Sequence, residues 1–159
     1  MAAMERTLVL LKPDAVQRGL VGRILARFEA KGLKLVGLKL RRFEPELLAE
    51  HYRDHRGKSF YEGLLRFMSS GPAVAAALEG ENAIAVTRSL MGKTNSAEAL
   101  PGTIRGDFGL SVSFNLVHGS DQPESARREL SIFFPGKDEI VAWTPVTEGW
   151  VYDLESGGS

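Results

Sequence analysis

The segment from Asn115 to Asp121 combines residue types that suit nucleophilic chemistry on an anionic substrate. His118 ends a predicted strand, where a side chain can line a cleft, and Gly119 allows a sharp turn or the close approach of a ligand. Ser120 offers a hydroxyl, and Asp121 precedes a predicted helix whose N-terminus would attract anions. The pattern predicts a nucleophilic histidine, although a histidine buried in the core fits the same apolar strand face equally well.

A carboxylate and several cations accompany this histidine. Glu129 lies on the next predicted helix, from which it can hydrogen-bond the imidazole and orient it. Lys12 directly follows a buried strand, which places its ammonium at a strand end. Arginine suits phosphate because its planar fork donates two hydrogen bonds to one group. Taken singly these cations are typical of a solvated surface, but around a polar loop they predict a triphosphate clamp formed by Lys12, Arg88, Lys93, Thr94 and Arg105.

Familiar nucleotide and metal motifs are absent from the sequence. The Gly-Lys-Thr sequence at 92–94 matches the end of a phosphate-binding P-loop, but Thr87 occupies the first glycine position, and no GxGxxG segment is present. His51 and His55 have a spacing that can bind zinc on a helix, yet no third ligand lies near them, which favours two solvated histidines. A bound nucleotide would need another architecture, in which Phe60 is either a core residue or a platform for the base.

The composition bounds the fold class. The chain has 159 residues, 20 basic and 20 acidic side chains, a formal net charge of zero and no cysteine. This length is typical of one domain with an ordinary core. The absence of cysteine excludes a disulfide scaffold and thiol catalysis, and the balanced charge argues against a dedicated nucleic-acid-binding protein. The apolar run from Leu8 to Leu11 is too short for a membrane span or a signal peptide, so we expect a cytoplasmic protein.

Hydrophobic periodicity predicts a mixture of helices and strands. Strands are expected at 7–11, at 33–43 with a bulge at Gly37, and at 112–118, where apolar and polar residues alternate. Helices are expected from Leu20 to a stop at Gly32, at 46–55, 60–68 and 82–91, and from 121 onward, the last with a capping-box pair at Asp121 and Glu124. Residues 73–78 fit a helix by composition and a strand by length, and 92–109 is expected to be a polar loop. Helices and strands do not alternate strictly, which predicts an α+β sandwich.

These segments together resemble the nucleoside diphosphate kinase family. The signature Asn-x-x-His-Gly-Ser-Asp stands at 115–121, and further family-like blocks stand, in the family's order, at 11–14 with 18–22, at 70–72, at 91–94 and at 101–108. The resemblance extends over residues 5–152. It implies a single domain over 1–152, with 153–159 as a flexible C-terminal tail. The sequence departs from many members at Ser113 and Phe114, where a Gly-x pair is common.

The resemblance implies a ferredoxin-like α+β sandwich with a four-stranded antiparallel sheet covered by helices, in which residues 73–78 form a strand. It also implies transfer of the terminal phosphate of a nucleoside triphosphate, such as ATP or GTP, to a diphosphate, such as ADP or GDP. The route would be ping-pong through phosphorylated His118, with broad base specificity because stacking contacts every base alike. Mg²⁺ would accompany the nucleotide phosphates, with Asp121 as an outer partner and no direct protein ligand.

The roles of individual residues follow from the resemblance in the same way. Glu129 and Ser120 would hold His118. Lys12 would contact the transferring phosphate and the ribose 3′-hydroxyl, and Asn115 would also bind the sugar. The residues expected along the phosphates are Tyr52, His55, Arg88, Thr94 and Arg105. Those expected around the base are Phe60, Leu64 and Val112.

The resemblance bears on assembly and on rival functions as well. The family forms tetramers or hexamers, and residues 150–152 resemble the longer tail of the hexameric type, so a homohexamer is favoured over a tetramer. A nucleotide-binding scaffold without turnover would lack His118, Lys12 or the clamp arginines, which are all present. A nucleic-acid-binding module would need a basic face with exposed aromatic residues, which the balanced charge disfavours as the main role.

Overall fold

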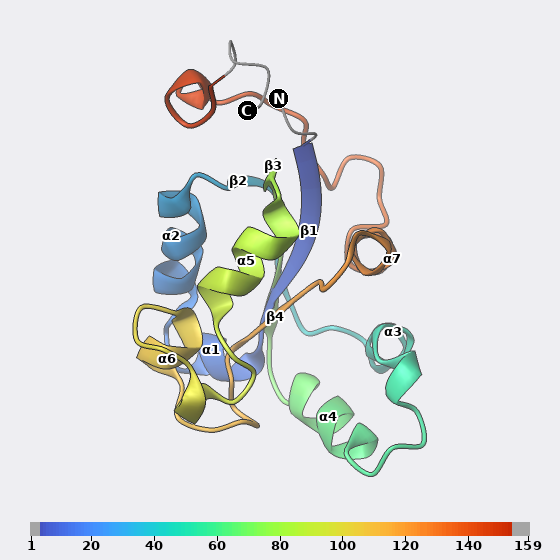
Figure 1. Ribbon diagram of the computed structural model, residues 1–159. Helices are drawn as coiled ribbons and strands as arrows, with labels where there is room; N and C mark the ends of the chain where they lie inside the picture. The colour runs from blue at the N-terminus through green and yellow to red at the C-terminus, as the bar shows by residue number, and fades with distance from the viewer. Residues whose placement is uncertain (1–3, 154–159) are drawn as a thin grey trace.

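A computed structural model describes residues 4–153 of the chain (Figure 1). Four strands form one antiparallel sheet in the order β2-β3-β1-β4. They are β1 (Met4–Leu11), β2 (Lys34–Arg41), β3 (Ala73–Glu81) and β4 (Val117–Gly119). Because β3 lies between β1 and β2, the connection from β1 to β2 passes over a strand that is added later, as in ferredoxin-like folds. The predicted fold class is confirmed.

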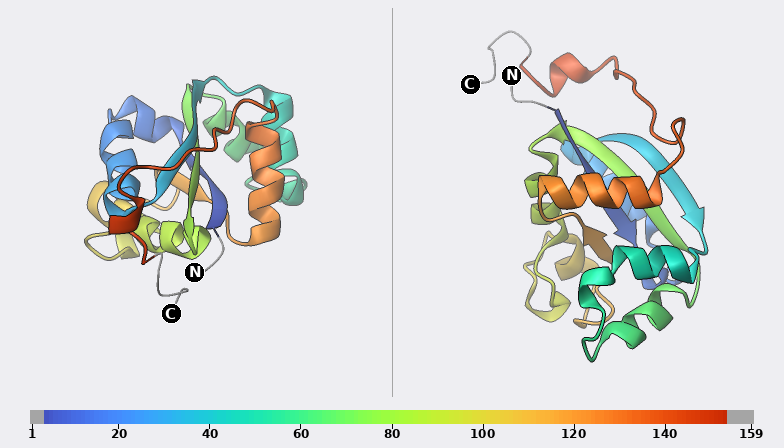
Figure 2. Two further views of the ribbon diagram at one scale, coloured as in Figure 1. Left: turned by 90° about the horizontal axis from the view of Figure 1, so that it is seen from above. Right: turned by 90° about the vertical axis from the view of Figure 1, so that its right-hand side faces the viewer.

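Helices cover both faces of this sheet. Figure 2 shows α2 and α5 on one face and α3 and α7 on the other. The seven α-helices among the described residues are α1 (Pro13–Gln17), α2 (Val21–Lys31), α3 (Pro45–His51), α4 (Tyr61–Met68), α5 (Ala83–Met91), α6 (Ile104–Phe108) and α7 (Pro123–Phe133). Short 3₁₀ turns stand at 53–55, 96–98 and 148–150. No helix within residues 4–153 is long and apolar enough to cross a membrane.

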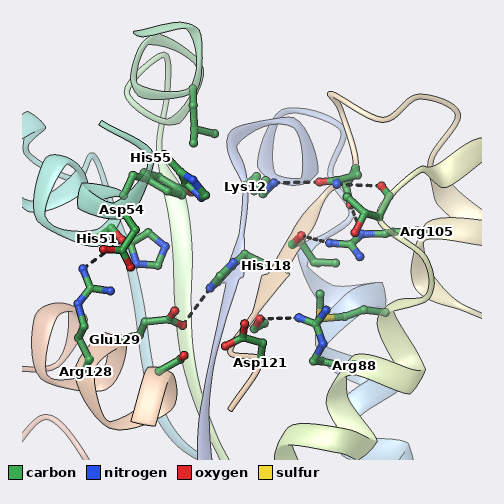
Figure 3. Close-up of a pocket in the computed structure, with 18 residues that line it drawn as sticks. Lys12, His51, Asp54, His55, Arg88, Arg105, His118, Asp121, Arg128 and Glu129 are labelled. Atoms are coloured by element: carbon green, nitrogen blue, oxygen red, sulfur yellow. Dashed lines mark hydrogen bonds and ion pairs between the residues drawn. The ribbon is translucent and has the colours of Figure 1, made fainter. Parts of the chain in front are cut away.

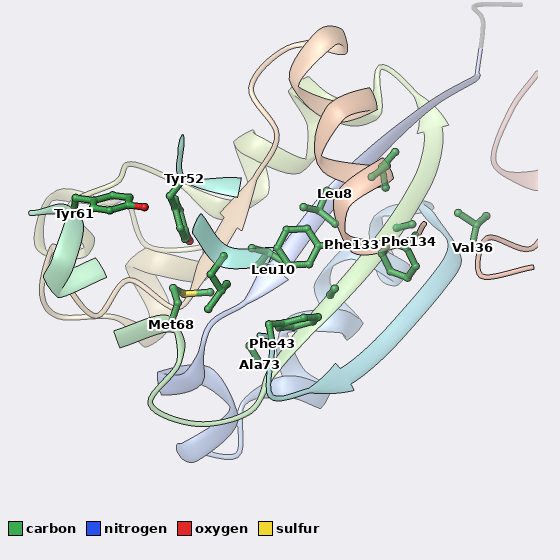
Figure 4. Packing of buried hydrophobic residues seen from close by; sticks show 14 residues of the cluster. Leu8, Leu10, Val36, Phe43, Tyr52, Tyr61, Met68, Ala73, Phe133 and Phe134 are labelled. Atoms are coloured by element: carbon green, nitrogen blue, oxygen red, sulfur yellow. The ribbon is translucent and has the colours of Figure 1, made fainter. Parts of the chain in front are cut away.

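The core lies on both sides of β1, whose side chains alternate between the two helical layers. Leu8 and Leu10 pack in a cluster with Phe133 of α7, which Figure 4 draws from close by. Val9 and Leu11 pack in a second cluster on the side of α2. Full burial of one such side chain contributes roughly 1.5–3 kcal/mol, so β1 is a rigid support for whatever lies at its end.

Two local predictions about β2 and β3 are confirmed. The pairing of β2 with β3 shifts register between Leu35 and Gly37, as expected for a bulge. A Cβ atom at Gly37 would lie 2.9 Å from a ring carbon of Phe134, so glycine is required for this close packing. Residues 73–78 belong to a strand, because a central position in the sheet outweighs the helix propensity of their alanines.

The predicted strand at 112–118 is wrong in extent, since only Val117–Gly119 pairs with β1. Leu116 has a φ of +73°, which interrupts an extended chain. Val112 and Phe114 are 54% and 57% exposed, so their alternation with polar residues does not mark a buried sheet face. The alternating apolar and polar residues at 112–114 line a cavity instead.

The boundaries of other elements also differ from the predictions. The helix expected at 46–55 ends at His51 and continues as a 3₁₀ turn at 53–55, and the polar segment 92–109 contains α6. The helix α1 after Lys12 was not predicted. The capping box at Asp121 and Glu124 is wrong, because α7 begins after Gln122 and has no side-chain cap. Apart from Asp153, the predicted tail 153–159 lies outside the described residues.

Candidate active site

A cavity of about 410 Å³ opens where β4 and the end of β1 meet α3, α5 and α7 (Figure 3). It brings together residues that are up to 117 positions apart in the chain, from Lys12 to Glu129. The predicted site residues along its wall are Lys12, Tyr52, His55, Leu64, Arg88, Thr94, Arg105, Asn115, His118 and Glu129. Asp121 lines the same cavity, whereas Phe60 and Val112 line a neighbouring slot.

His118 is fixed by a hydrogen-bond chain that starts in the sheet. In the sheet, His118 of β4 pairs with Leu10 of β1. The Nε2 atom of its ring lies 3.0 Å from Oε1 of Glu129. Ser120 donates to the same carboxylate oxygen at 2.7 Å, and its own hydroxyl accepts the Leu8 N–H at 3.3 Å. The His118 side chain is 26% exposed and points into the cavity (Figure 3). With Nε2 turned to Glu129, Nδ1 is the ring nitrogen left for a ligand.

Glu129 stays charged although its side chain is largely buried. Burial alone would raise its pKa, but the hydrogen bond and charge interaction with His118, together with the Ser120 hydroxyl, outweigh burial and lower it. A carboxylate that accepts a hydrogen bond from Nε2 selects the tautomer with the proton on Nε2 and the lone pair on Nδ1. The pair therefore presents a nucleophilic nitrogen to the cavity.

The chain reaches His118 through a tight turn at Leu116. The Val117 N–H donates to the Asn115 carbonyl at 2.8 Å, which closes a γ-turn around the positive φ of Leu116. This strained residue is held from both sides, because its N–H donates to Asp14 Oδ2 at 3.1 Å and its carbonyl accepts the Lys12 N–H at 2.8 Å. The turn aims Asn115 and His118 at one cavity.

Lys12 and Asn115 meet across this turn. Lys12 Nζ donates to Asn115 Oδ1 at 2.9 Å, and Asn115 Nδ2 donates to the Thr94 carbonyl at 3.0 Å. Burial lowers the pKa of Lys12 to about 8, and the charge of Arg105 adds to this, while Asp14 opposes it. The ammonium remains charged at neutral pH and is poorly solvated, so an anion that enters the cavity gains a strong interaction.

The two arginines of the predicted clamp have different surroundings. Arg105 is 6% exposed and donates to three backbone carbonyls, those of Gly92, Asn115 and Val117, at 2.9, 3.2 and 2.7 Å. Within residues 4–153, Arg88 donates to one group, the Gly119 carbonyl, at 3.1 Å. A guanidinium has five N–H donors. Both side chains thus keep donors for a ligand, but Arg105 also ties three chain segments together.

Several cavity residues were not nominated as site residues from the sequence, among them His51 and Arg128. His51 was considered only as a zinc ligand, yet it is buried with its ring centroid 4.9 Å from that of His118, edge to face. Burial lowers the pKa of His51 to about 3, so its ring is neutral. Arg128 donates to the Glu50 and His51 carbonyls and thereby joins α7 to α3. The position of Arg128 next to Glu129 was the only sequence signal for it.

A second, apolar cavity of about 710 Å³ adjoins the first. Lys12, Leu64 and Thr94 line both cavities, so the two lie side by side. Phe60 and Val112 line only the slot, and Phe60 is 51% exposed, which removes it from the core. The volume lies within the range of small-molecule sites. A charged cavity beside an apolar one suits a ligand with phosphates at one end and a flat ring at the other.

A histidine held by a carboxylate, cations in the same cavity and an apolar slot beside it suit an enzyme of the phosphotransferase class that acts on nucleotides. The family model for nucleoside diphosphate kinase matches residues 5–139. The nucleoside diphosphate kinase of Archaeoglobus fulgidus is 55% identical over 150 residues, which is 94% of this chain and 99% of that protein. The enzyme of the same name from Synechococcus is 53% identical over 150 residues, covering 94% of this chain and all of the relative.

Solved structures agree with these sequences. A halophilic nucleoside diphosphate kinase from Halobacterium salinarum, in complex with CDP, matches with a TM-score of 0.91 and 48% identity over 94% of this chain and 99% of that one. A family protein from Babesia bovis matches with a TM-score of 0.90 and 44% identity. The chain belongs to the nucleoside diphosphate kinase family. It transfers phosphate from nucleoside triphosphates to nucleoside diphosphates.

Proposed function

We propose that His118 carries the phosphoryl group between donor and acceptor. In the first half-reaction the Nδ1 lone pair attacks the terminal phosphorus, and the bond to the bridging oxygen breaks, so that the diphosphate leaves with the electron pair. In the second, the terminal oxygen of a different diphosphate attacks the same phosphorus and the N–P bond breaks. The observation that carries this proposal is the orientation of His118, whose Nε2 faces Glu129 and leaves Nδ1 as the other ring nitrogen, in a cavity that Lys12, Arg88 and Arg105 also line.

Glu129 and Ser120 act as positioning residues in this proposal. The Glu129 carboxylate keeps the Nε2 proton in place and stabilises the positive charge that develops on the ring as Nδ1 bonds to phosphorus. Ser120 is buried and donates to that carboxylate, so it fixes Glu129 and does not face the substrate. The proposal is tested by incubation with Mg²⁺ and ATP without an acceptor. We expect one phosphoryl group per chain, which added GDP removes as GTP.

The remaining cavity residues bind the substrate. The phosphates are neutralised by Lys12, Arg88 and Arg105, because in-line transfer requires positive charge wherever negative charge accumulates. Lys12 and Asn115 also contact the sugar. The hydrogen bond between them fixes both side chains in the cavity before the sugar binds. The other phosphate contacts are Tyr52, His55 and Thr94. The CDP complex of the Halobacterium salinarum enzyme supports the binding of a nucleoside diphosphate to this fold.

The base lies in the slot, against Phe60 and between Leu64 and Val112. None of these three side chains has a hydrogen-bonding group that could distinguish one base edge from another. Stacking contacts the flat face that all bases share, which supports broad acceptance of bases. His55 stands 5.2 Å from Phe60 between ring centroids, at the border of the slot and the phosphate cavity.

Mg²⁺ enters with the nucleotide in this proposal. No group of three or more acidic, histidine or cysteine side chains within residues 4–153 could hold a metal ion by itself. Mg²⁺ often relies on one or two carboxylates and on substrate phosphates, and Asp121 lines the phosphate cavity. The donor set therefore fits an ion held mainly by phosphates and water, with Asp121 as an outer partner. When bound, the ion would neutralise phosphate charge.

We expect the alkaline limb of the pH profile to report Lys12. The value of kcat/KM should fall about tenfold per pH unit above about pH 8, because the ammonium of the free enzyme loses its proton there. Lys12→Arg keeps its charge at higher pH, so its alkaline limb should move upward even where its activity is lower. A limb at the same pH in both proteins would assign it to another group.

Unfolding does not explain this loss, because stability changes in the opposite direction. The ordinary pKa of lysine is 10.5, and that of Lys12 in the folded chain is about 8. Between these values the unfolded state binds more protons than the folded state, so the contribution of Lys12 to the free energy of unfolding rises with pH. A melting curve at each pH separates the two effects.

We propose one domain over residues 1–152, a homo-oligomer and a cytoplasmic location. The edge strand β2 exposes Leu38 and Leu40, 51% and 63% respectively, and exposed apolar edges are usually covered. This supports association with further copies of the chain. The preference for a hexamer over a tetramer rests on the resemblance of residues 150–152 to the longer family tail, and a measured mass in solution distinguishes the two.

A further inference from the structure

The apolar slot contains an aromatic side chain to which the proposed base contacts assign no role. Phe114 lines the slot and is 57% exposed. Its ring lies edge to face against Phe67 of α4, with centroids 5.3 Å apart and an interplanar angle of 80°. Phe67 in turn packs against the core cluster on that side of the sheet. An exposed ring is thus held against a fixed one.

The backbone around Phe114 is also restrained. Its N–H donates to the Ser111 hydroxyl at 3.1 Å, which closes a local turn over residues 111–114. The next residue, Asn115, is buried and bonded to Lys12. Phe114 is therefore positioned by contacts on both sides and presents its free surface to the slot.

Polar and apolar groups are distributed unevenly along the slot. Lys12 and Thr94 stand at the end shared with the phosphate cavity. Away from that end the large side chains are apolar, namely Phe60, Phe67, Val112 and Phe114. Such a wall recognises a base by the area in contact and not by hydrogen bonds to its edge. A two-ring purine offers this wall more area than a one-ring pyrimidine.

We infer that Phe114 is a specificity-determining residue that favours purine over pyrimidine nucleoside diphosphates. The inference rests on the proposed placement of the base in the slot. The wall formed by Phe114 and Phe67 contacts the part of a purine that a pyrimidine lacks. All bases still stack on Phe60, so Phe114 adds a graded preference to a broad specificity and excludes no base.

The test compares Phe114→Ser with Leu110→Ser, using GDP and CDP as acceptors. Leu110 belongs to the same loop and is 88% exposed, but it does not line the slot, so its variant controls for loss of an apolar loop residue. For Phe114→Ser we expect kcat/KM to fall about fivefold with GDP and less than about twofold with CDP, as one aromatic contact would give. The loss should appear in KM and not in kcat at saturating substrate.

Phe60→Ala distinguishes a failure of the inference about Phe114 from a failure of the proposed placement of the base in the slot. If Phe60→Ala weakens both acceptors but Phe114→Ser changes neither, or changes both equally, Phe114 does not set specificity and the inference is overturned. The same holds if kcat falls together with kcat/KM in Phe114→Ser, because that result indicates a role in the loop. If Phe60→Ala changes neither acceptor, the base does not lie in the slot, and the proposed placement fails first.

Discussion

His118→Ala is expected to lower kcat by at least about 10⁴-fold, because it removes the nitrogen that accepts the phosphoryl group in the proposed mechanism. The Ser120 hydroxyl shares Glu129 with His118, but it is fully buried and donates to that carboxylate. Lys12 is charged at neutral pH and has no lone pair to offer. Steady-state transfer from ATP to GDP measures the effect.

Substrate binding is expected to survive this change. The cations that hold the phosphates come from the residue after β1, from α5 and from α6, and none of them hydrogen-bonds to His118 within the described part of the chain. Titration calorimetry with ADP should therefore give a dissociation constant close to that of the unchanged enzyme. His118→Gln fills more of the space beside His51 and controls for a packing defect. Retention of more than about 1% of kcat in both variants would contradict a phosphohistidine route.

Arg105→Ala is expected to destabilise the folded chain by about 3–5 kcal/mol, because it leaves three carbonyl groups without their charged donor. These carbonyls belong to Gly92, Asn115 and Val117, which flank the strained turn at Leu116 and the end of α5. The melting temperature should fall by about 10 °C at fixed protein concentration. Phosphate binding should weaken as well.

Arg88→Ala is the matched control for this prediction. Arg88 lines the same cavity and has the same charge, but it donates to a single carbonyl. We expect Arg88→Ala to weaken nucleotide binding with a fall in melting temperature of less than about 3 °C. Equal melting temperatures for the two variants would show that the three carbonyl bonds of Arg105 contribute little to stability.

The sheet and most helices could be predicted because their signals are local. A continuous apolar run at 7–11 marks a strand buried on both faces, and β1 has this environment. Gly37 marks a change of phase that corresponds to an observed bulge. The run of alanines at 73–78 could not be decided by composition, since its strand conformation depends on pairing with β1 and β2.

The reactive side chains of the site could be predicted from the sequence, but the backbone turn and hydrogen bonds that hold them could not. His118, Glu129 and Ser120 were selected by residue type and spacing, and the structure brings them within hydrogen-bond distance. The γ-turn at Leu116 has no sequence signal, because an ordinary apolar residue there adopts a positive φ only under tertiary restraint. The bonds of Arg105 to backbone carbonyls also depend on segments that meet only in the folded chain.

In the proposed mechanism the phosphoryl group rests on one nitrogen of His118 between the two half-reactions. The measurement that tests it most directly is phosphorus NMR of the enzyme after incubation with Mg²⁺ and ATP and removal of free nucleotide. We predict a single phosphoramidate at Nδ1, because Nε2 faces Glu129, and its loss in acid but not in base. A phosphoester on Ser120 that survives acid, or an enzyme that turns over without any covalent phosphate, would contradict the account.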